Sequence, residues 1–171
     1  MSDATTPTAP ASSLQGAMDR LSRIVVGLAA AALLGLVLVQ GWQVIARYVL
    51  NDSPSWTEPV TVLLLSTTMS LGAAAGVHER RHFSFALLAE ALSPGLRHAM
   101  HLLAQLAVVL IGAVLAWWGT VLFADGLGIR AAGAALPQSA NYLPMAVGGA
   151  LMALFAAVQL AGEFRGDGGA H

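Results

Sequence analysis

The chain has 171 residues, of which 57% are hydrophobic and only 10% are charged, and its mean hydropathy is +0.71. Soluble domains carry about 25% charged residues, so this composition excludes an ordinary soluble domain and favours a helical protein that crosses a membrane several times. The formal net charge of −1 argues against nucleic acid as a partner, and the absence of cysteine excludes disulfides, thiolate metal sites and cysteine nucleophiles.

The first 18 residues are predicted to form a disordered cytoplasmic tail. Residues 1–13, MSDATTPTAPASS, are small and polar, with Asp3 as the only charged side chain, and they cannot form a core. They lack the basic start of a secretory signal, and the apolar run that follows is too long for one. Asp19 and Arg23 are spaced to pair at i,i+4 on the entry turns of the first helix.

Four apolar runs are each long enough to cross a bilayer, which takes about 20 residues. They cover approximately residues 24–46, 59–77, 99–123 and 142–162. The sequence thus predicts an all-α membrane protein with a four-helix membrane domain over residues 19–164 and a cytoplasmic C-terminal tail over residues 165–171. Each run carries small residues at four-residue spacing, which allow helices in lipid to pack closely. These are Gly27, Ala31 and Gly35; Thr68, Gly72 and Gly76; Gly112, Ala116 and Thr120; and Gly149, Ala153, Ala157 and Ala161.

The arginines predict the orientation, because every cationic residue of the chain except histidine is an arginine. With the N-terminus in the cytoplasm, the cytoplasmic side holds Arg20, Arg23, Arg80, Arg81, Arg97 and Arg165, and the far side holds Arg47 and Arg130. Cytoplasmic loops carry an excess of Lys and Arg, so both termini are predicted to be cytoplasmic.

The segment FSFALLAEAL, residues 83–92, is too short to span the membrane. It follows a basic cluster and precedes Ser93 and Pro94, which can cap and begin a new helix. We expect a short amphipathic helix in the cytoplasmic interface, with Glu90 turned to water. The alternative is an extension of the second spanning helix.

The sequence HERRH, residues 78–82, is a literal H-E-x-x-H motif. On a helix it would place His78 and His82 on one face for zinc, with Glu79 as general base. The intervening arginines oppose a dication, and no downstream H-x-x-G-x-x-H extension supplies a third ligand. A membrane zinc enzyme therefore stays an alternative reading rather than the favoured one.

A small ion-coupled carrier that works alone is the second alternative. Such carriers normally place an ionisable side chain inside the membrane. None of the nine acidic residues falls in the middle of a predicted span, and the deepest strongly polar side chains are Gln105 and Gln159. These two glutamines are expected to form hydrogen bonds between helices. The pattern favours an accessory subunit.

The stretch RYVLNDSPSWTEPV, residues 47–60, concentrates charge between the first two spans. Its turn-forming residues predict that these helices return as close antiparallel neighbours. Arg47 and Glu58 are then expected to form a charge-assisted pair across the hairpin, with Trp56 anchoring the turn at the interface. The alternative is that Arg47 extends to lipid phosphates while Glu58 only favours a helix N-terminus.

The same stretch resembles the signature of the small permease subunits (DctQ-like) of tripartite ATP-independent periplasmic (TRAP) transporters, in which an Arg-Tyr ends the first helix and a Trp-x-Glu opens the second. MSLGAAAGVHERRHFSF, LSPGLRHAMHLL and LPQSANYLPMAVGGALMAL are similar to later parts of the family pattern, and the similarity spans roughly residues 20–162.

The resemblance implies a non-enzymatic, multi-pass subunit of the bacterial inner membrane. Its partners would be a large permease subunit, which carries the substrate and sodium sites, and a periplasmic solute-binding protein. It would brace the large subunit during sodium symport of an organic acid and hold no cofactor or metal. No catalytic residue is implied, and the expected structural or interface residues are Arg47, Tyr48, Trp56, Glu58, Arg80, Arg81 and His82.

Overall fold

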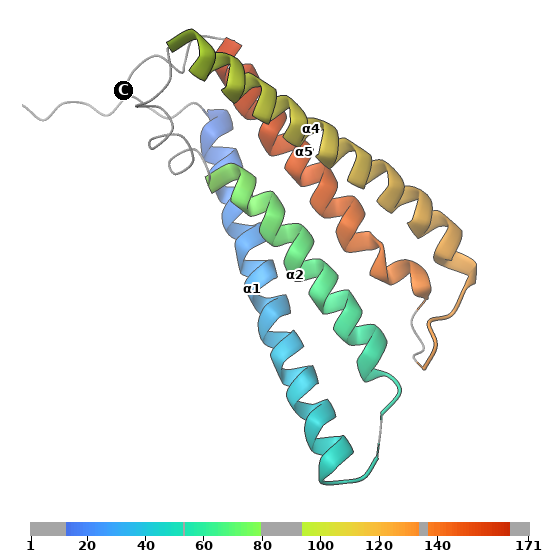
Figure 1. Ribbon diagram of the computed structural model, residues 1–171. Helices are drawn as coiled ribbons and strands as arrows, with labels where there is room; N and C mark the ends of the chain where they lie inside the picture. The colour runs from blue at the N-terminus through green and yellow to red at the C-terminus, as the bar shows by residue number, and fades with distance from the viewer. Residues whose placement is uncertain (1–12, 53, 80–93, 134–136, 165–171) are drawn as a thin grey trace, which may run out of the picture.

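Four long helices make up most of the computed structural model, which describes residues 13–52, 54–79, 94–133 and 137–164. They are α1 (Ser13–Tyr48), α2 (Thr57–Glu79), α4 (Pro94–Asp125) and α5 (Leu143–Phe164), and two short 3-10 helices, η2 (Gly126–Gly128) and η3 (Gln138–Asn141), lie between α4 and α5 (Figure 1). Each long helix is apolar and long enough to cross a membrane. The predicted all-α, four-span architecture is confirmed.

The four helices lie side by side in the order α1, α2, α5, α4, which differs from their order in the chain (Figure 1). The last helix therefore inserts between α2 and α4, and α1 and α4 become the two edges of a row. Of the residues in each spanning window, 11% are buried in α4, 17% in α1 and in α2, and 33% in α5, so α5 is the most covered of the four helices.

Glycine permits a close approach between α4 and α5. A Cβ added to Gly149 would lie 2.6 Å from the backbone nitrogen of Ala116, and one added to Gly112 would lie 2.7 Å from that of Ala153. Backbone atoms cannot move aside as a flexible side chain can, so both positions require glycine. Two of the predicted small-residue stripes thus pack against each other.

A small apolar core forms where α1, α2 and α5 meet. It consists of Val25, Ala29, Leu71 and Ala75, with Leu21 and Leu151 packed against it. We call this end of the domain, where α2 finishes at Glu79, the His78 end, and the opposite end the Trp56 end. All four tryptophans lie toward the Trp56 end and are exposed: Trp42, Trp56, Trp117 and Trp118. Tryptophan gathers at membrane interfaces, so this end has the composition of an aromatic belt.

The α1–α2 hairpin closes through local hydrogen bonds. Asn51 has a φ of 52°, a left-handed conformation that asparagine tolerates, and the Asp52 N–H donates to the Ala46 carbonyl at 3.0 Å. The Thr57 hydroxyl donates to the Pro54 carbonyl at 2.8 Å, at the start of α2. The predicted tight turn between the first two helices is present.

The structure differs from the sequence-based boundaries at the N-terminus. Helix α1 begins at Ser13, inside the segment predicted to be a disordered tail over residues 1–18. Met18 and Leu21 are partly buried, so the early turns of α1 have apolar contacts that the hydropathy of the segment alone does not reveal. The predicted interfacial helix at 83–92 lies outside the described residues, as do Arg80, Arg81 and His82.

Candidate functional site: a polar chain across the four helices

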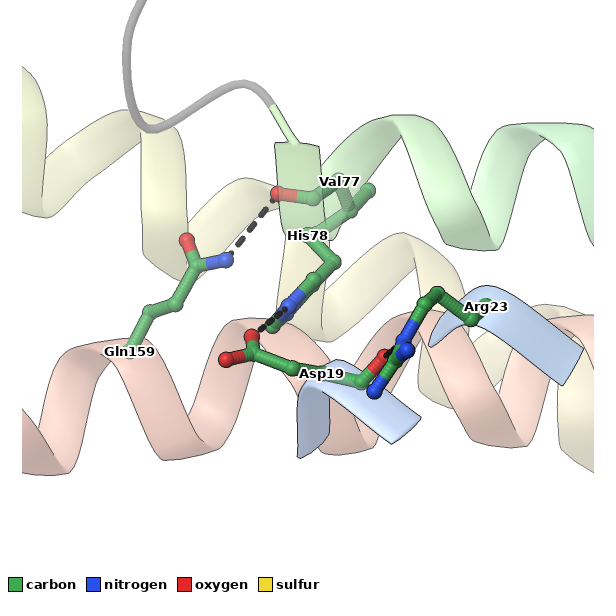
Figure 2. Close-up of polar contacts among 5 residues, drawn as sticks. All are labelled: Asp19, Arg23, Val77, His78 and Gln159. Carbon is green, nitrogen blue, oxygen red and sulfur yellow. Dashed lines mark hydrogen bonds and ion pairs between the residues drawn. The ribbon is translucent and has the colours of Figure 1, made fainter. Parts of the chain in front are cut away.

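Asp19 and His78 connect α1 to α2 at the His78 end. The His78 Nε2 lies 2.8 Å from the Asp19 Oδ1, and the two side chains are 18% and 62% exposed (Figure 2). The predicted pair between Asp19 and Arg23 is wrong in its acceptor: the Arg23 Nε–H donates to the backbone carbonyl of Asp19 at 3.4 Å. The Asp19 carboxylate faces the neighbouring helix instead.

The imidazole of His78 is also fixed by an aromatic contact. Its ring centroid lies 5.0 Å from that of Phe155 on α5, with the planes tilted by 42°. Phe155 is 1% exposed and is one of the largest fully buried side chains among the described residues. His78 therefore bridges a solvent-facing carboxylate on α1 and the buried apolar interior.

Two buried glutamines extend the contact to the remaining helices. The Gln159 Nε2–H of α5 donates to the Val77 carbonyl of α2 at 3.0 Å, and the Gln105 Nε2–H of α4 donates to the Gln159 Oε1 at 2.6 Å. Val77 lies in the last turn of α2, where carbonyls lack a donor within their own helix, so Gln159 supplies one. The expected hydrogen bonding of Gln105 and Gln159 between helices is confirmed.

Together these contacts form a polar chain that links every adjacent pair of helices in the row. It runs from Asp19 to His78, through Val77 to Gln159, and on to Gln105, all at the His78 end. In a membrane, hydrogen bonds between helices contribute about 0.6–2 kcal/mol each. These hydrogen bonds hold neighbouring helices together.

The role of His78 was missed in the sequence analysis, where it belonged only to the HExxH motif. Among the described residues, no three His, Cys, Asp or Glu side chains gather as a metal site would require. His82, the second histidine of the motif, lies outside those residues. The sequence held one indication of this role, because Asp19 and His78 were both predicted to lie at the cytoplasmic side of the membrane.

At the Trp56 end, the expected Arg47–Glu58 pair is not formed. Both residues are exposed, and among the described residues the one close contact between a basic and an acidic side chain is that of His78 with Asp19. Their immediate predecessors, Ala46 (1% exposed) and Thr57 (0% exposed), occupy the buried positions of the hairpin. Because each helical residue is rotated by about 100° from the one before it, Arg47 and Glu58 turn away from that contact.

The aromatic neighbours of this pair are exposed as well. Tyr48 is 80% exposed and Trp56 is 43% exposed, so both are available to a membrane interface or a partner. Ser55 links the hairpin to the other half of the domain, because its hydroxyl donates to the Gly133 carbonyl at 3.1 Å. This link between the two hairpins was not anticipated from the sequence.

The fold and these contacts define a multi-pass helical membrane protein whose buried polar groups join its helices. The family model of the DctQ component of tripartite ATP-independent periplasmic transporters matches residues 36–166, more than half of the chain. The chain belongs to this family, which is a family of transporter components rather than enzymes. A comparison with curated proteins gave no match.

Proposed function

We propose that the chain is the small accessory subunit of a TRAP-type secondary transporter and that it braces a large membrane subunit. The assembled transporter would use sodium to drive uptake of an organic acid delivered by a periplasmic binding protein. The substrate and sodium sites would lie on the large subunit, and this chain would need no cofactor. Membership of the DctQ family supports the role in a transporter. The resemblance of the sequence to small TRAP permease subunits supports the assignment of the substrate and sodium sites to the large subunit.

The observation that carries the accessory role is where the ionisable groups lie. In the described helices, the acidic residues occupy sequence positions near helix ends: Asp19, Glu58, Glu79, Asp125 and Glu163. Ion-coupled carriers normally hold such a group at mid-membrane depth. The two glutamine side chains that are buried among the described helices, Gln105 and Gln159, are already bonded to each other.

The shape of the row supports bracing. Helices α1 and α4 have 36 and 32 residues, which corresponds to about 54 and 48 Å at 1.5 Å per residue, well beyond an apolar layer of about 30 Å. Long helices accommodate such a layer by tilting or by extending beyond it. A Cβ at Gly72 or Gly76 would meet nothing within 4 Å, so these small residues remain open to another helix. A large membrane partner would cover such surfaces.

Reconstitution tests the proposal. Liposomes that contain only this chain should show no sodium-driven solute uptake, whereas liposomes with both membrane subunits and the binding protein should take up the organic acid. A matched preparation of the large subunit alone measures what the small one adds. Ion-driven uptake by this chain by itself would overturn the accessory role and support the independent-carrier alternative.

We propose further that the chain lies in the bacterial inner membrane with both termini cytoplasmic. Because the natural chain has no cysteine, Thr8→Cys and Gly168→Cys each introduce a single labelling site. A membrane-impermeant thiol reagent added to intact spheroplasts should label neither site until the membrane is opened. Labelling of either site in sealed spheroplasts would contradict the proposed cytoplasmic location of both termini.

A further inference from the structure

Two arginines near the start of α1 line an open hollow on the outer edge of the row. Among the described residues, Arg20, Arg23 and Ile24 border an open space of about 430 Å³, and all three side chains are exposed. They belong to the edge helix α1, whose only extensive neighbour among the described elements is α2. The hollow is therefore open to whatever surrounds the protein at the His78 end.

Neither arginine of this hollow is paired with a carboxylate in the described part of the chain. Asp19 is the nearest carboxylate in sequence, but its Oδ1 is engaged by His78 at 2.8 Å on the α2 side. Arg23 uses its Nε–H on the Asp19 backbone carbonyl, which leaves its terminal nitrogens available. Neither arginine forms an ion pair with another described residue. Two guanidinium groups thus remain open to an external anion.

The spacing of the arginines suits a phosphate group. Residues three apart on a helix have Cβ atoms about 5–6 Å apart, so both side chains reach one anion. Guanidinium presents its N–H donors in a planar fork that binds phosphate oxygens in pairs. A phosphodiester held between Arg20 and Arg23 would receive several charge-assisted hydrogen bonds.

The surface next to the arginines is apolar, which points to a lipid rather than a soluble anion. Counting from Arg20, the positions one, two and three turns further along the same face of α1 are Ile24, Gly27 and Ala31, all exposed. Ile24 is 60% exposed, and a Cβ at Gly27 would meet nothing within 4 Å. The apolar run predicted for this helix starts near residue 24, so we expect the arginines just before it to lie at the level of the bilayer phosphates.

We propose that Arg20 and Arg23 form a binding site for an anionic glycerophospholipid. The two guanidinium groups bind its phosphate, and an acyl chain lies along Ile24 and the open surface at Gly27. A site that holds a negatively charged lipid here shields the two adjacent positive charges and fills the uncovered edge of α1. This inference goes beyond the transporter role and does not depend on the identity of the large subunit.

The test measures lipid binding to the full-length chain. Native mass spectrometry of the purified, delipidated protein would be used to titrate phosphatidylglycerol against phosphatidylcholine with the same acyl chains. An arginine near the membrane surface contributes about a fivefold gain in affinity for anionic lipid, so the double variant R20Q/R23Q should lose about thirtyfold. The control R47Q/R130Q removes two exposed arginines from the Trp56 end and should keep the His78-end site.

Several outcomes decide the proposal. Equal affinity of the natural chain for the two lipids, or equal losses in the two double variants, would refute a specific site at Arg20 and Arg23. Displacement of the lipid by inorganic phosphate at equal concentration would show that the arginines bind a free anion. Loss of the large subunit from R20Q/R23Q with unchanged lipid binding would assign the arginines to a protein contact.

A further variant guards against misfolding as the cause of lost binding. R20K/R23K keeps both charges but removes the forked donors, so it should bind phosphatidylglycerol with an affinity between those of the natural chain and R20Q/R23Q. If R20Q/R23Q does not fold, the single variants R20Q and R23Q should each lose about fivefold. If R20K/R23K bound phosphatidylglycerol as tightly as the natural chain, positive charge alone would account for the affinity. That result would contradict the proposed contact between the guanidinium groups and the phosphate.

Discussion

Replacing Gln159 by leucine tests whether the polar chain stabilises the membrane domain. Gln159→Leu removes the donor to the Val77 carbonyl and the acceptor of the Gln105 amide. Leucine is similar in size, so the change leaves the packing volume nearly intact while deleting both hydrogen bonds. Gln105, at 9% exposed, would then be buried without the partner it has in the native chain.

The expected loss follows from these contacts. Two hydrogen bonds between helices contribute about 0.6–2 kcal/mol each, and a buried amide left without its partner costs about 1–3 kcal/mol. Since the two estimates partly describe the same loss, we expect a total of about 3 kcal/mol. For a chain of this length, that corresponds to a decrease in Tm of roughly 6–12 °C.

Thermal unfolding of the purified chain in detergent would measure the effect, with two comparison variants. Gln105→Leu/Gln159→Leu removes both amides, so it should be more stable than Gln159→Leu alone, because no glutamine remains buried without its partner. Gln40→Leu, at an exposed glutamine that accepts from Thr61 at 3.0 Å, should lower Tm by less. An unchanged Tm for Gln159→Leu, or a double variant less stable than both single variants, would refute the reasoning.

Three further predictions follow from other contacts. Gly149→Ala should destabilise the domain by about 1–3 kcal/mol because its Cβ would press on the backbone of α4. Gly27→Ala, with open space around it, should be neutral or stabilising in the same melting assay. Equal effects of the two substitutions would contradict the glycine-dependent packing. Arg47→Glu combined with Glu58→Arg should restore nothing that either single change loses in co-purification with the large subunit, since the two residues are not paired; restoration by the exchanged charges would establish the pair. Chelator treatment should leave Tm unchanged, because the His78 Nε2 already faces Asp19; stoichiometric zinc that is lost in His78→Ala would instead support a metal site.

The number and position of the membrane helices could be predicted from the sequence because these depend on local hydropathy and length. The runs beginning near residues 24, 59 and 99 fall inside α1, α2 and α4, and the run beginning near residue 142 starts one residue before α5. The interhelical role of Gln105 and Gln159 was also predictable, since an amide deep in an apolar run needs a partner. Both inferences require only the chemistry of one segment and its solvent.

The order of the row and the choice of polar partners were decided by the tertiary structure. Lipid tails are as apolar as leucine, so the side of a spanning helix that faces lipid and the side that faces another helix can have the same composition. The sequence therefore did not show that α5 lies between α2 and α4, or that the Asp19 carboxylate meets His78 rather than Arg23. Arg47 and Glu58 directly follow the buried Ala46 and Thr57 in the sequence. Because successive helical residues are rotated by about 100°, this one position is enough to turn both charged side chains away from the contact across the hairpin.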